Sequence, residues 1–264
     1  MSEVLRLDDV WTAFDRGRER VSVLAGASLS VDAGEIVAVV AGAGQGKTTL
    51  VRLASGTLPP DRGVVSIGRH ELSRLKDRQL ARVLASEVGV ATGTGPGLRV
   101  TARQYVEMAA AAPKTGRRRR WRRRERRRMT TAVLEELGIA DCGPLRWDEL
   151  SDWQRVLVEL AQAVVVRPRL LLLDDIADRF GLSQKQALVT LLEDFARDYE
   201  CGVLMAVADH GAAARAVRVW RLHRCRLQLL ADHTGVAVGA RGAVIPLRRS
   251  HGRRDLSKAR RQDA

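Results

Sequence analysis

Apolar and polar residues alternate along two N-terminal segments of the chain, residues 3–10 and 21–31. Alternation with a period of two is typical of strands with one buried face, so both segments are predicted to be strands. A turn at residues 32–34 separates the second segment from IVAVV, a wholly apolar run at residues 36–40. Such a run is typical of a strand buried on both faces of a parallel sheet. Further strands are predicted at residues 64–67, 170–175 and 203–208.

Apolar residues recur at helical spacing in the segments between these strands. The predicted helices include residues 71–87 and 101–112, with a flexible glycine-rich loop between them at residues 93–97. Another helix is predicted to end at Gly138, and a further one runs from residue 151 to 166. Helices that alternate with buried strands indicate an α/β protein.

A glycine-rich turn follows the strand at residues 36–40 and opens the next helix. The turn fits the pattern G-x-x-x-x-G-K-[ST], with Ala41 in place of the first glycine. Phosphate groups need converging backbone N–H donors, the positive end of a helix and a cation, and this turn supplies the first two while Lys47 supplies the third. The chain is therefore predicted to be a P-loop NTPase. The predicted phosphate-binding residues are Gly42, Gly44, Gln45, Gly46, Lys47, Thr48 and Thr49.

Two carboxylates, Asp174 and Asp175, follow four leucines at the end of a predicted strand. Ligands of a parallel sheet bind beyond the carboxyl ends of its strands, so we expect these side chains near the phosphate-binding turn. Asp174 is predicted to hold Mg²⁺ together with the Thr48 hydroxyl. Taken alone, the two carboxylates also fit an acidic turn without a binding role.

The composition indicates a globular protein. The chain has 264 residues, of which 45% are hydrophobic, enough for one large or two small domains. No apolar run approaches the roughly 20 residues of a membrane-spanning helix, and the N-terminus does not resemble a signal sequence. Three widely separated cysteines, Cys142, Cys201 and Cys225, are typical of reduced thiols. We therefore expect a cytosolic protein.

The net charge of +14 comes from two segments. Arg117–Arg128 contains ten arginines and one glutamate, and residues 248–264 contain seven basic and two acidic residues. The rest of the chain is neutral. Basic segments of this kind bind nucleic-acid phosphates or an anionic membrane surface. The alternative is a solvated helix surface and a disordered tail.

The motif LSDWQR at residues 150–155 precedes the acidic strand by about 20 residues. The order of phosphate loop, L-S-x-x-Q-R and apolar strand ending in Asp174 resembles the ATP-binding subunit of ATP-binding cassette (ABC) transporters. The segments GEIVAVV and GTLPPDRGVVSIGR also resemble this family, and the resemblance covers residues 3 to about 230.

The resemblance implies a RecA-like mixed sheet core with an edge antiparallel β-subdomain and a helical subdomain at about residues 93–166. The ATP-binding domain is expected at residues 1–230, and residues 231–264 form a basic C-terminal extension that is expected to be partly disordered. Two such subunits would dimerise head to tail, with each ATP between one chain's phosphate loop and the other chain's signature. Ser151 and Gln154 are the signature residues expected to bind ATP.

The resemblance also assigns an adenine contact. Phe14 falls where the family usually has an aromatic residue that stacks on adenine. Trp11 is close enough to compete for this role, and an ordinary core position is an equal alternative for Phe14.

Two site motifs depart from the family's pattern. Asp152 and Trp153 replace the two signature glycines, so a carboxylate and an indole stand where the backbone usually approaches phosphate closely. Asp175 replaces a glutamate that positions or deprotonates the attacking water. Because its side chain is one methylene shorter, the chemical step is expected to be slow.

Three loops also depart from that pattern. Residues 88–98 contain no glutamine, and Thr92 or Gly93 occupies the position of one that usually contacts Mg²⁺. Ala208 or Asp209 replaces a histidine that contacts the γ-phosphate, with His210 displaced by one or two residues. The aspartate-bearing loop after the second carboxylate is altered to the sequence DRFG, residues 178–181.

Groups that bind MgATP persist, whereas groups that hydrolyse ATP or sense its γ-phosphate are mostly replaced. We therefore predict an ATP-binding subunit of an ABC-type membrane transporter that uses ATP and Mg²⁺, with Asp175 as a weak catalytic base. The expected partners are membrane-spanning subunits and a second cassette, which can be identical or different. The chain is expected at the cytoplasmic face of the membrane, where Arg117–Arg128 would contact anionic lipid. One alternative is a nucleotide-gated regulatory or scaffolding protein. A nucleic-acid-associated ATPase is the other, and it has less support because such proteins more often have two cassettes and a second one is not expected here.

Overall fold

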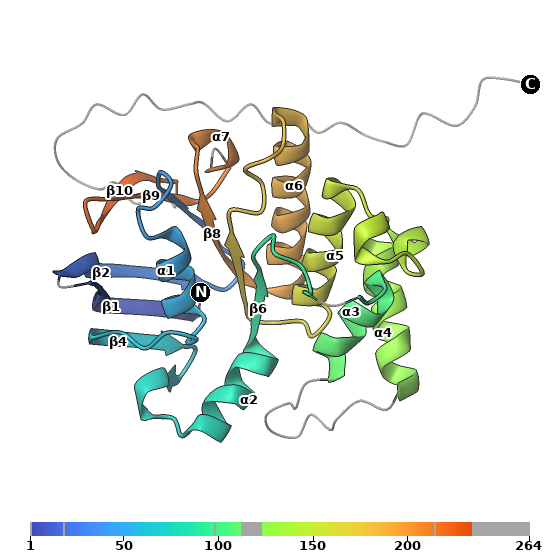
Figure 1. The fold of residues 1–264 in the computed structure, drawn as a ribbon, viewed down its shortest axis with the longest axis horizontal. Helices are drawn as coiled ribbons and strands as arrows, with labels where there is room; N and C mark the ends of the chain where they lie inside the picture. Colours follow the sequence, from blue (N-terminus) through green and yellow to red (C-terminus); the bar gives the residue numbers. More distant parts are fainter. Residues whose placement is uncertain (1, 18, 98, 112–122, 214, 234–264) are drawn as a thin grey trace, which may run out of the picture.

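A mixed six-stranded sheet forms the centre of the molecule, in the order β10-β9-β3-β8-β7-β6 (Figure 1). The structure is a computed structural model, and it describes residues 2–17, 19–97, 99–111, 123–213 and 215–233. The strands from β9 to β6 are parallel, and β10 pairs antiparallel with β9. The bounds are β3 (Ile36–Val40), β6 (Val88–Ala91), β7 (Leu170–Asp174), β8 (Gly202–Val207), β9 (Arg218–His223) and β10 (Arg226–Asp232).

A second, antiparallel sheet lies beside the first, in the order β2-β1-β4-β5. Its strands are β1 (Glu3–Arg16), β2 (Glu19–Asp32), β4 (Arg62–Ile67) and β5 (His70–Glu71). The strands predicted at residues 3–10 and 21–31 are confirmed, and the first continues to Arg16. This sheet is the predicted edge β-subdomain.

The helices cover both faces of the central sheet (Figure 1). Their bounds are α1 (Lys47–Ala54), α2 (Asp77–Glu87), α3 (Ala102–Ala111), α4 (Arg123–Glu136), α5 (Asp152–Val164), α6 (Leu182–Tyr199) and α7 (His210–Ala213). Helices α3, α4 and α5 pack against one another and fall within the range predicted for the helical subdomain. Within the described part of the chain, no helix is long and apolar enough to cross a membrane.

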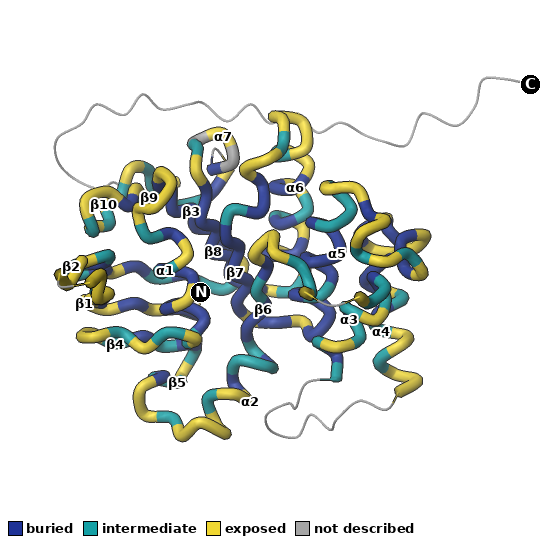
Figure 2. Tube along the Cα trace, viewed as in Figure 1, coloured by how far each residue is buried: buried dark blue, intermediate teal, exposed yellow. Residues whose placement is uncertain are grey.

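Strands β3, β7 and β8 are buried along their whole length (Figure 2). Alternate residues of these strands belong to two different cores. Ile36, Ala38 and Val40 of β3 pack in the core that contains α3, α4, α5 and α6. Val37 and Val39 pack in the core formed with α1 and the antiparallel sheet. Because successive side chains of a strand point to opposite faces, a strand covered on both sides needs a continuous apolar run. This explains the IVAVV and LLLLD segments.

Some predicted elements differ from the structure. The helix predicted at residues 71–87 is wrong in its first part, where β5 and a 3-10 turn (Leu72–Arg74) precede α2. The prediction also lacks β6, α6, β9 and β10. Strand β10 runs past the predicted domain boundary at residue 230. Residues 234–264 of the predicted extension and residues 117–122 of the arginine run lie outside the described residues.

Candidate functional site

The carboxyl ends of β3 and β7 lie on either side of β8 at one edge of the central sheet. Strand β3 leads into residues 41–46, here called the phosphate loop, and β7 ends at Asp174. The Ala41 N–H donates to the Val207 carbonyl at 3.0 Å, and the Asp175 N–H donates to the Ala206 carbonyl at 3.0 Å. The sheet therefore brings the glycine-rich loop and the two carboxylates to one edge, as predicted.

The phosphate loop ends at Gly46, the N-cap of α1, which has φ 102°. A side chain at this position is disfavoured by the positive φ and by crowding, because an added Cβ would lie 2.7 Å from Val23 Cγ1. Among the described residues, no side chain caps α1, and its first turn contains no acidic residue. The N–H groups and the positive end of the helix dipole are therefore left for an anion.

Lys47 opens α1, and its side chain is only 5% exposed. Its Nζ donates to the Ala41 carbonyl at 2.8 Å and forms an ion pair with Asp175 Oδ2 at 3.1 Å. A buried ammonium is costly unless an anion and hydrogen-bond acceptors surround it, and these two groups meet that need. The Lys47 ammonium has three N–H donors, so a phosphate that approaches it would compete with the Asp175 carboxylate for this lysine.

Asp174 has the properties of a magnesium ligand. It is 6% exposed, and its Oδ1 has no hydrogen-bond partner among the described residues. Burial raises the pKa of Asp174, while a hydrogen bond with Thr48 and the charge of Lys47 act in the opposite direction. A carboxylate oxygen without a partner, next to a hydroxyl, is a donor set that suits a hard divalent cation. These residues therefore fit Mg²⁺.

Asp175 has a perturbed environment. Burial and, to a smaller degree, the nearby charge of Asp178 raise the pKa of Asp175 to about 6, against the hydrogen bond and charge of Lys47. Its backbone has φ 51°, an uncommon conformation for a residue with a side chain. Asp178 is fixed in turn, because its Oδ1 accepts the Ala208 N–H at 3.2 Å. A carboxyl with a pKa near neutrality can accept a proton, but here it is engaged by Lys47.

Ser151 and Gln154 form a capping box at the start of α5. The Ser151 hydroxyl accepts the Gln154 N–H at 3.3 Å, and Gln154 Oε1 accepts the Ser151 N–H at 2.9 Å. Trp153 packs at right angles to Phe180, with ring centroids 5.4 Å apart. Helix α5 belongs to the core on the opposite face of the sheet from α1. Within one chain, the structure therefore does not bring these residues together with the phosphate loop.

Glu159 on α5 is a site residue that the sequence prediction missed. It is 2% exposed, and its carboxylate accepts the N–H groups of Thr92, Gly93 and Gly95 at 3.1, 2.6 and 2.5 Å. This is the loop after β6, where the resemblance leads one to expect a glutamine. The signal in the sequence is a single acidic residue within an otherwise apolar run of α5, VLVELA.

Trp147 closes the other side of this loop. Gly95 has φ 70°, and an added Cβ would lie 2.5 Å from the Trp147 ring. Tyr105 of α3 packs edge-on against Trp147, with ring centroids 5.6 Å apart. Burial, with the charge of Glu159, raises the pKa of Tyr105 to about 12. The loop after β6 is thus tied to the helical part of the molecule by a buried carboxylate and an aromatic pair.

Ala208 and Asp209 follow β8, in the segment where the family usually has a histidine that contacts the γ-phosphate. Asp209 Oδ1 accepts the Gly211 N–H at 2.7 Å at the start of α7. The side chain of His210 lies outside what the structure describes. A carboxylate therefore stands at the end of β8.

Both aromatic candidates for the adenine contact lie on β1 and are exposed, Trp11 by 37% and Phe14 by 38%. The core position considered for Phe14 is therefore wrong. Phe14 pairs with Val21 of β2, two residues from the Val23 side chain that borders Gly46. The adenine contact itself stays a prediction.

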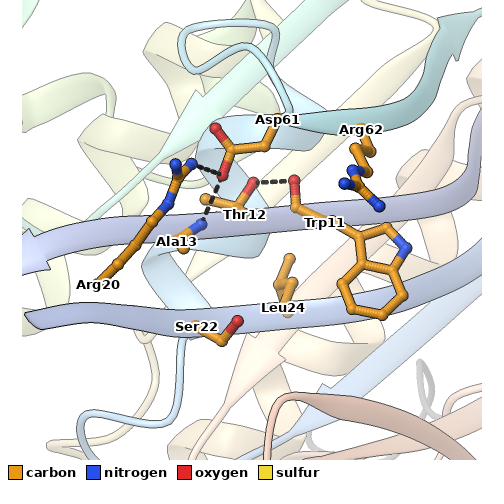
Figure 3. Close-up of a pocket in the computed structure, with 8 residues that line it drawn as sticks. All are labelled: Trp11, Thr12, Ala13, Arg20, Ser22, Leu24, Asp61 and Arg62. Carbon is orange, nitrogen blue, oxygen red and sulfur yellow. Dashed lines mark hydrogen bonds and ion pairs between the residues drawn. The ribbon is translucent and has the colours of Figure 1, made fainter.

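Trp11 lines a cavity of about 350 Å³ formed by β1, β2 and the start of β4 (Figure 3). In this cavity Asp61 binds Arg20 at 2.9 Å and accepts the Ala13 N–H at 2.9 Å. The hydrogen bond with Ala13, followed by that with Arg20, lowers the pKa of Asp61. The ionised carboxylate thus holds the two strands and the turn before β4 together.

The fold and the site define a P-loop nucleotide-binding protein. The family model described as ABC transporter matches residues 24–178. The lipoprotein-releasing system ATP-binding protein LolD of Cereibacter sphaeroides is 34% identical over 229 residues, which cover 86% of this chain and all of that protein (100%). A Thermotoga maritima ABC transporter ATP-binding protein is 31% identical over 214 residues, 80% of this chain and 86% of that protein. The chain therefore belongs to the ATP-binding subunits of the ABC transporter family.

A solved structure supports the fold. The dimeric structure of MJ0796, a bacterial ABC transporter cassette, matches with a TM-score of 0.79 and covers 88% of this chain and 100% of that chain. The sequence identity is 20%, so this likeness concerns the fold alone. It confirms the predicted α/β P-loop class with its antiparallel subdomain.

Replacing Glu159 with glutamine is expected to release the loop after β6 from α5. The amide has only one acceptor oxygen, so at least one of the three loop N–H groups loses its partner. We expect the free energy of unfolding to fall by about 2 kcal/mol and the loop to lose protection from hydrogen exchange. Urea unfolding and hydrogen-exchange mass spectrometry measure the two effects. Glu19→Gln, on the exposed start of β2, is the control, and equal results for both variants would contradict the assignment.

Proposed function

We propose that the chain is an ATP-binding subunit of an ABC-type membrane transporter that binds MgATP and hydrolyses it slowly. The observation that carries this proposal is the Lys47–Asp175 ion pair beside the Asp174 oxygen that has no hydrogen-bond partner among the described residues. The pair offers a cation for phosphate next to a ligand for magnesium. The same pair also engages the carboxylate that would serve as the base.

In the proposed complex, Lys47 exchanges Asp175 for the β- and γ-phosphates, and the N–H groups of the phosphate loop and α1 donate to the phosphate oxygens. Bound Mg²⁺ would offset phosphate charge, and Thr48 and Asp174 would hold it. Phe14, or Trp11 in its place, would stack on adenine. The remaining phosphate-binding residues in this proposal are Gly42, Gly44, Gln45, Gly46 and Thr49.

Two features of Asp175 support slow hydrolysis. Its side chain is one methylene shorter than the usual glutamate, and a base must come within roughly 2.6 to 3.2 Å of the proton that it accepts. In addition, Asp175 Oδ2 lies 3.1 Å from Lys47 Nζ, so one oxygen is directed to the lysine. A displacement of about an ångström from the productive geometry costs about 100-fold in rate.

The proposal includes a second cassette, identical or different, and membrane-spanning subunits. MJ0796 is described as dimeric, and LolD is named as part of a lipoprotein-releasing system. Ser151 and Asp152 at the start of α5 are exposed, so this end of the helix can contact the ATP of a partner cassette, although the capping box already uses the N–H of Gln154. The bulky Trp153 and the acidic Asp152 would weaken that contact.

The proposed location is the cytoplasmic face of the membrane. Helix α4 carries the exposed arginines Arg124, Arg127 and Arg128, which line a hollow of about 350 Å³ with Thr131. Basic side chains on one helix surface suit anionic lipid headgroups. A nucleic-acid partner is the alternative for the same basic face, since phosphates of nucleic acid would also pair with these arginines.

A nucleotide-gated regulatory or scaffolding protein without turnover is the second candidate function. The engagement of Asp175 by Lys47 favours it as well, since both functions need binding but only a transporter subunit needs hydrolysis. Measurable turnover by the isolated chain would exclude this candidate.

Replacing Lys47 with alanine is expected to weaken MgATP binding at least about tenfold, because a charge-assisted contact to phosphate contributes about 1.5 to 3 kcal/mol. Isothermal titration calorimetry on the full chain measures this change. Lys76→Ala removes an exposed lysine before α2 and is the control. Failure of the wild-type chain to bind MgATP would contradict the proposed function.

Lengthening the base by the substitution Asp175→Glu is expected to raise ATP turnover about tenfold, with the MgATP Kd within threefold of the wild type, because the carboxylate regains reach. A phosphate-release assay at saturating MgATP measures turnover. Asp178→Glu adds the same methylene to the neighbouring carboxylate and should not raise it. If Asp175→Glu binds MgATP but is no faster than the wild type, the assignment of Asp175 is wrong.

A further inference from the structure

Lys185 is a second lysine at the edge that carries the phosphate loop, and the proposed function gives it no role. It lies in the first turn of α6. Its Nζ is 2.5 Å from Asp209 Oδ2, and its side chain is 12% exposed, compared with 47% for Asp209. The ion pair joins the start of α6 to the segment that follows β8.

The segment that contains Asp209 lies between the two halves of the nucleotide site. Strand β8 runs between β3 and β7. Its last residue, Val207, accepts the N–H of Ala41 in the phosphate loop, and the next residue, Ala208, donates to Asp178 in the segment after β7. Asp209 follows immediately. The chain therefore brings a carboxylate close to both the loop that would hold phosphate and the segment that follows Asp174, the proposed magnesium ligand.

A triphosphate would meet several negative charges at this edge. Asp174, Asp175 and Asp178 surround the end of β7, and Lys47 is already paired with Asp175. Like charges repel strongly where water is partly excluded. An uncompensated charge on Asp209 would act most on the terminal phosphate, because the proposed function places that group between Lys47 and Asp174.

We propose that Lys185 is a positioning residue that lets this site prefer ATP to ADP. By pairing with Asp209, Lys185 neutralises the carboxylate and holds it away from the terminal phosphate. This inference rests on the proposed function, because it requires nucleotide in the phosphate loop. It assigns to a lysine of α6 a task that no sequence motif of the chain indicates.

A purely structural role for the ion pair predicts something different. Asp209 also accepts the Gly211 N–H at 2.7 Å, so it caps α7 as well as binding Lys185. If the pair only ordered this segment, its loss would weaken ATP and ADP to the same degree. If it compensates charge, its loss weakens ATP selectively, and removing the charge of Asp209 reverses the effect.

The test is the affinity of the full chain for MgATP and for MgADP, measured by isothermal titration calorimetry for the wild type, Lys185→Met, Asp209→Asn and the double variant. We expect Lys185→Met to weaken MgATP about tenfold and MgADP less than threefold, since tenfold is a typical size for one lost charge compensation. The double variant should return to within threefold of the wild type for both nucleotides.

Arg215→Met is the matched control. It removes a cation whose ion pair with Glu193 also joins α6 to the segment after β8, but which lies on an exposed surface. Its ratio of ATP to ADP affinity should equal that of the wild type. Circular dichroism confirms that each variant is folded before titration.

Equal weakening of both nucleotides by Lys185→Met, or no recovery in the double variant, would overturn the inference. If Lys185→Met does not fold, the Asp209→Asn variant decides between the two roles. Charge compensation predicts that Asp209→Asn binds MgATP at least as tightly as the wild type. A purely structural role predicts that Asp209→Asn loses affinity for both nucleotides. A wild-type chain that binds neither nucleotide would refute the proposed function itself. That result can be told apart from failure of the inference about Lys185, in which the wild-type chain still binds nucleotide.

Discussion

The ion pair between Lys47 and Asp175 is the interaction on which the rest of the site depends. A lysine that is 5% exposed must keep an anion, and at 3.1 Å the chain supplies its own. The ion pair thereby fixes the lysine at the start of α1, and its partner is the residue that we propose as the catalytic base. Phosphate bound at Lys47 would compete with Asp175 for the lysine, so nucleotide binding and the freedom of the proposed base are coupled.

The order of the central sheet makes this pair possible. Strand β8 separates β3 from β7, so the phosphate loop and the two aspartates face each other across one strand width. The segments that leave β7 and β8 then cross-link through Asp178 and Ala208 and through Lys185 and Asp209. Two carboxylates at this edge thus form ion pairs with lysines, Asp175 with Lys47 and Asp209 with Lys185.

Local signals account for what the sequence could predict. The apolar runs of β3 and β7 and the glycine pattern before Lys47 are contiguous, so these two strands, the phosphate loop and the proposed magnesium ligand Asp174 could be located. Strand β6 was missed because it has four residues without alternation, and β9 because arginines interrupt it. Helix α6 is also absent from the prediction, although its buried positions recur at helical spacing and could have identified it. These positions are Leu188, Val189, Leu192, Phe195 and Ala196.

Contacts between distant segments could not be predicted. Glu159 binds a loop more than 60 residues away, and no pattern in one sequence links the two. The motif S-x-x-Q at Ser151 carries two meanings, because it matches both a family signature and an ordinary capping box.

The proposed function has nucleotide phosphate take the place of Asp175 beside Lys47. A crystal structure of the chain with Mg²⁺ and a non-hydrolysable ATP analogue would show whether it does. We expect Lys47 to contact the β- and γ-phosphates, Thr48 and Asp174 to hold the metal ion, and Asp175 to be separated from the lysine. Nucleotide bound elsewhere with the Lys47–Asp175 pair intact would contradict this expectation.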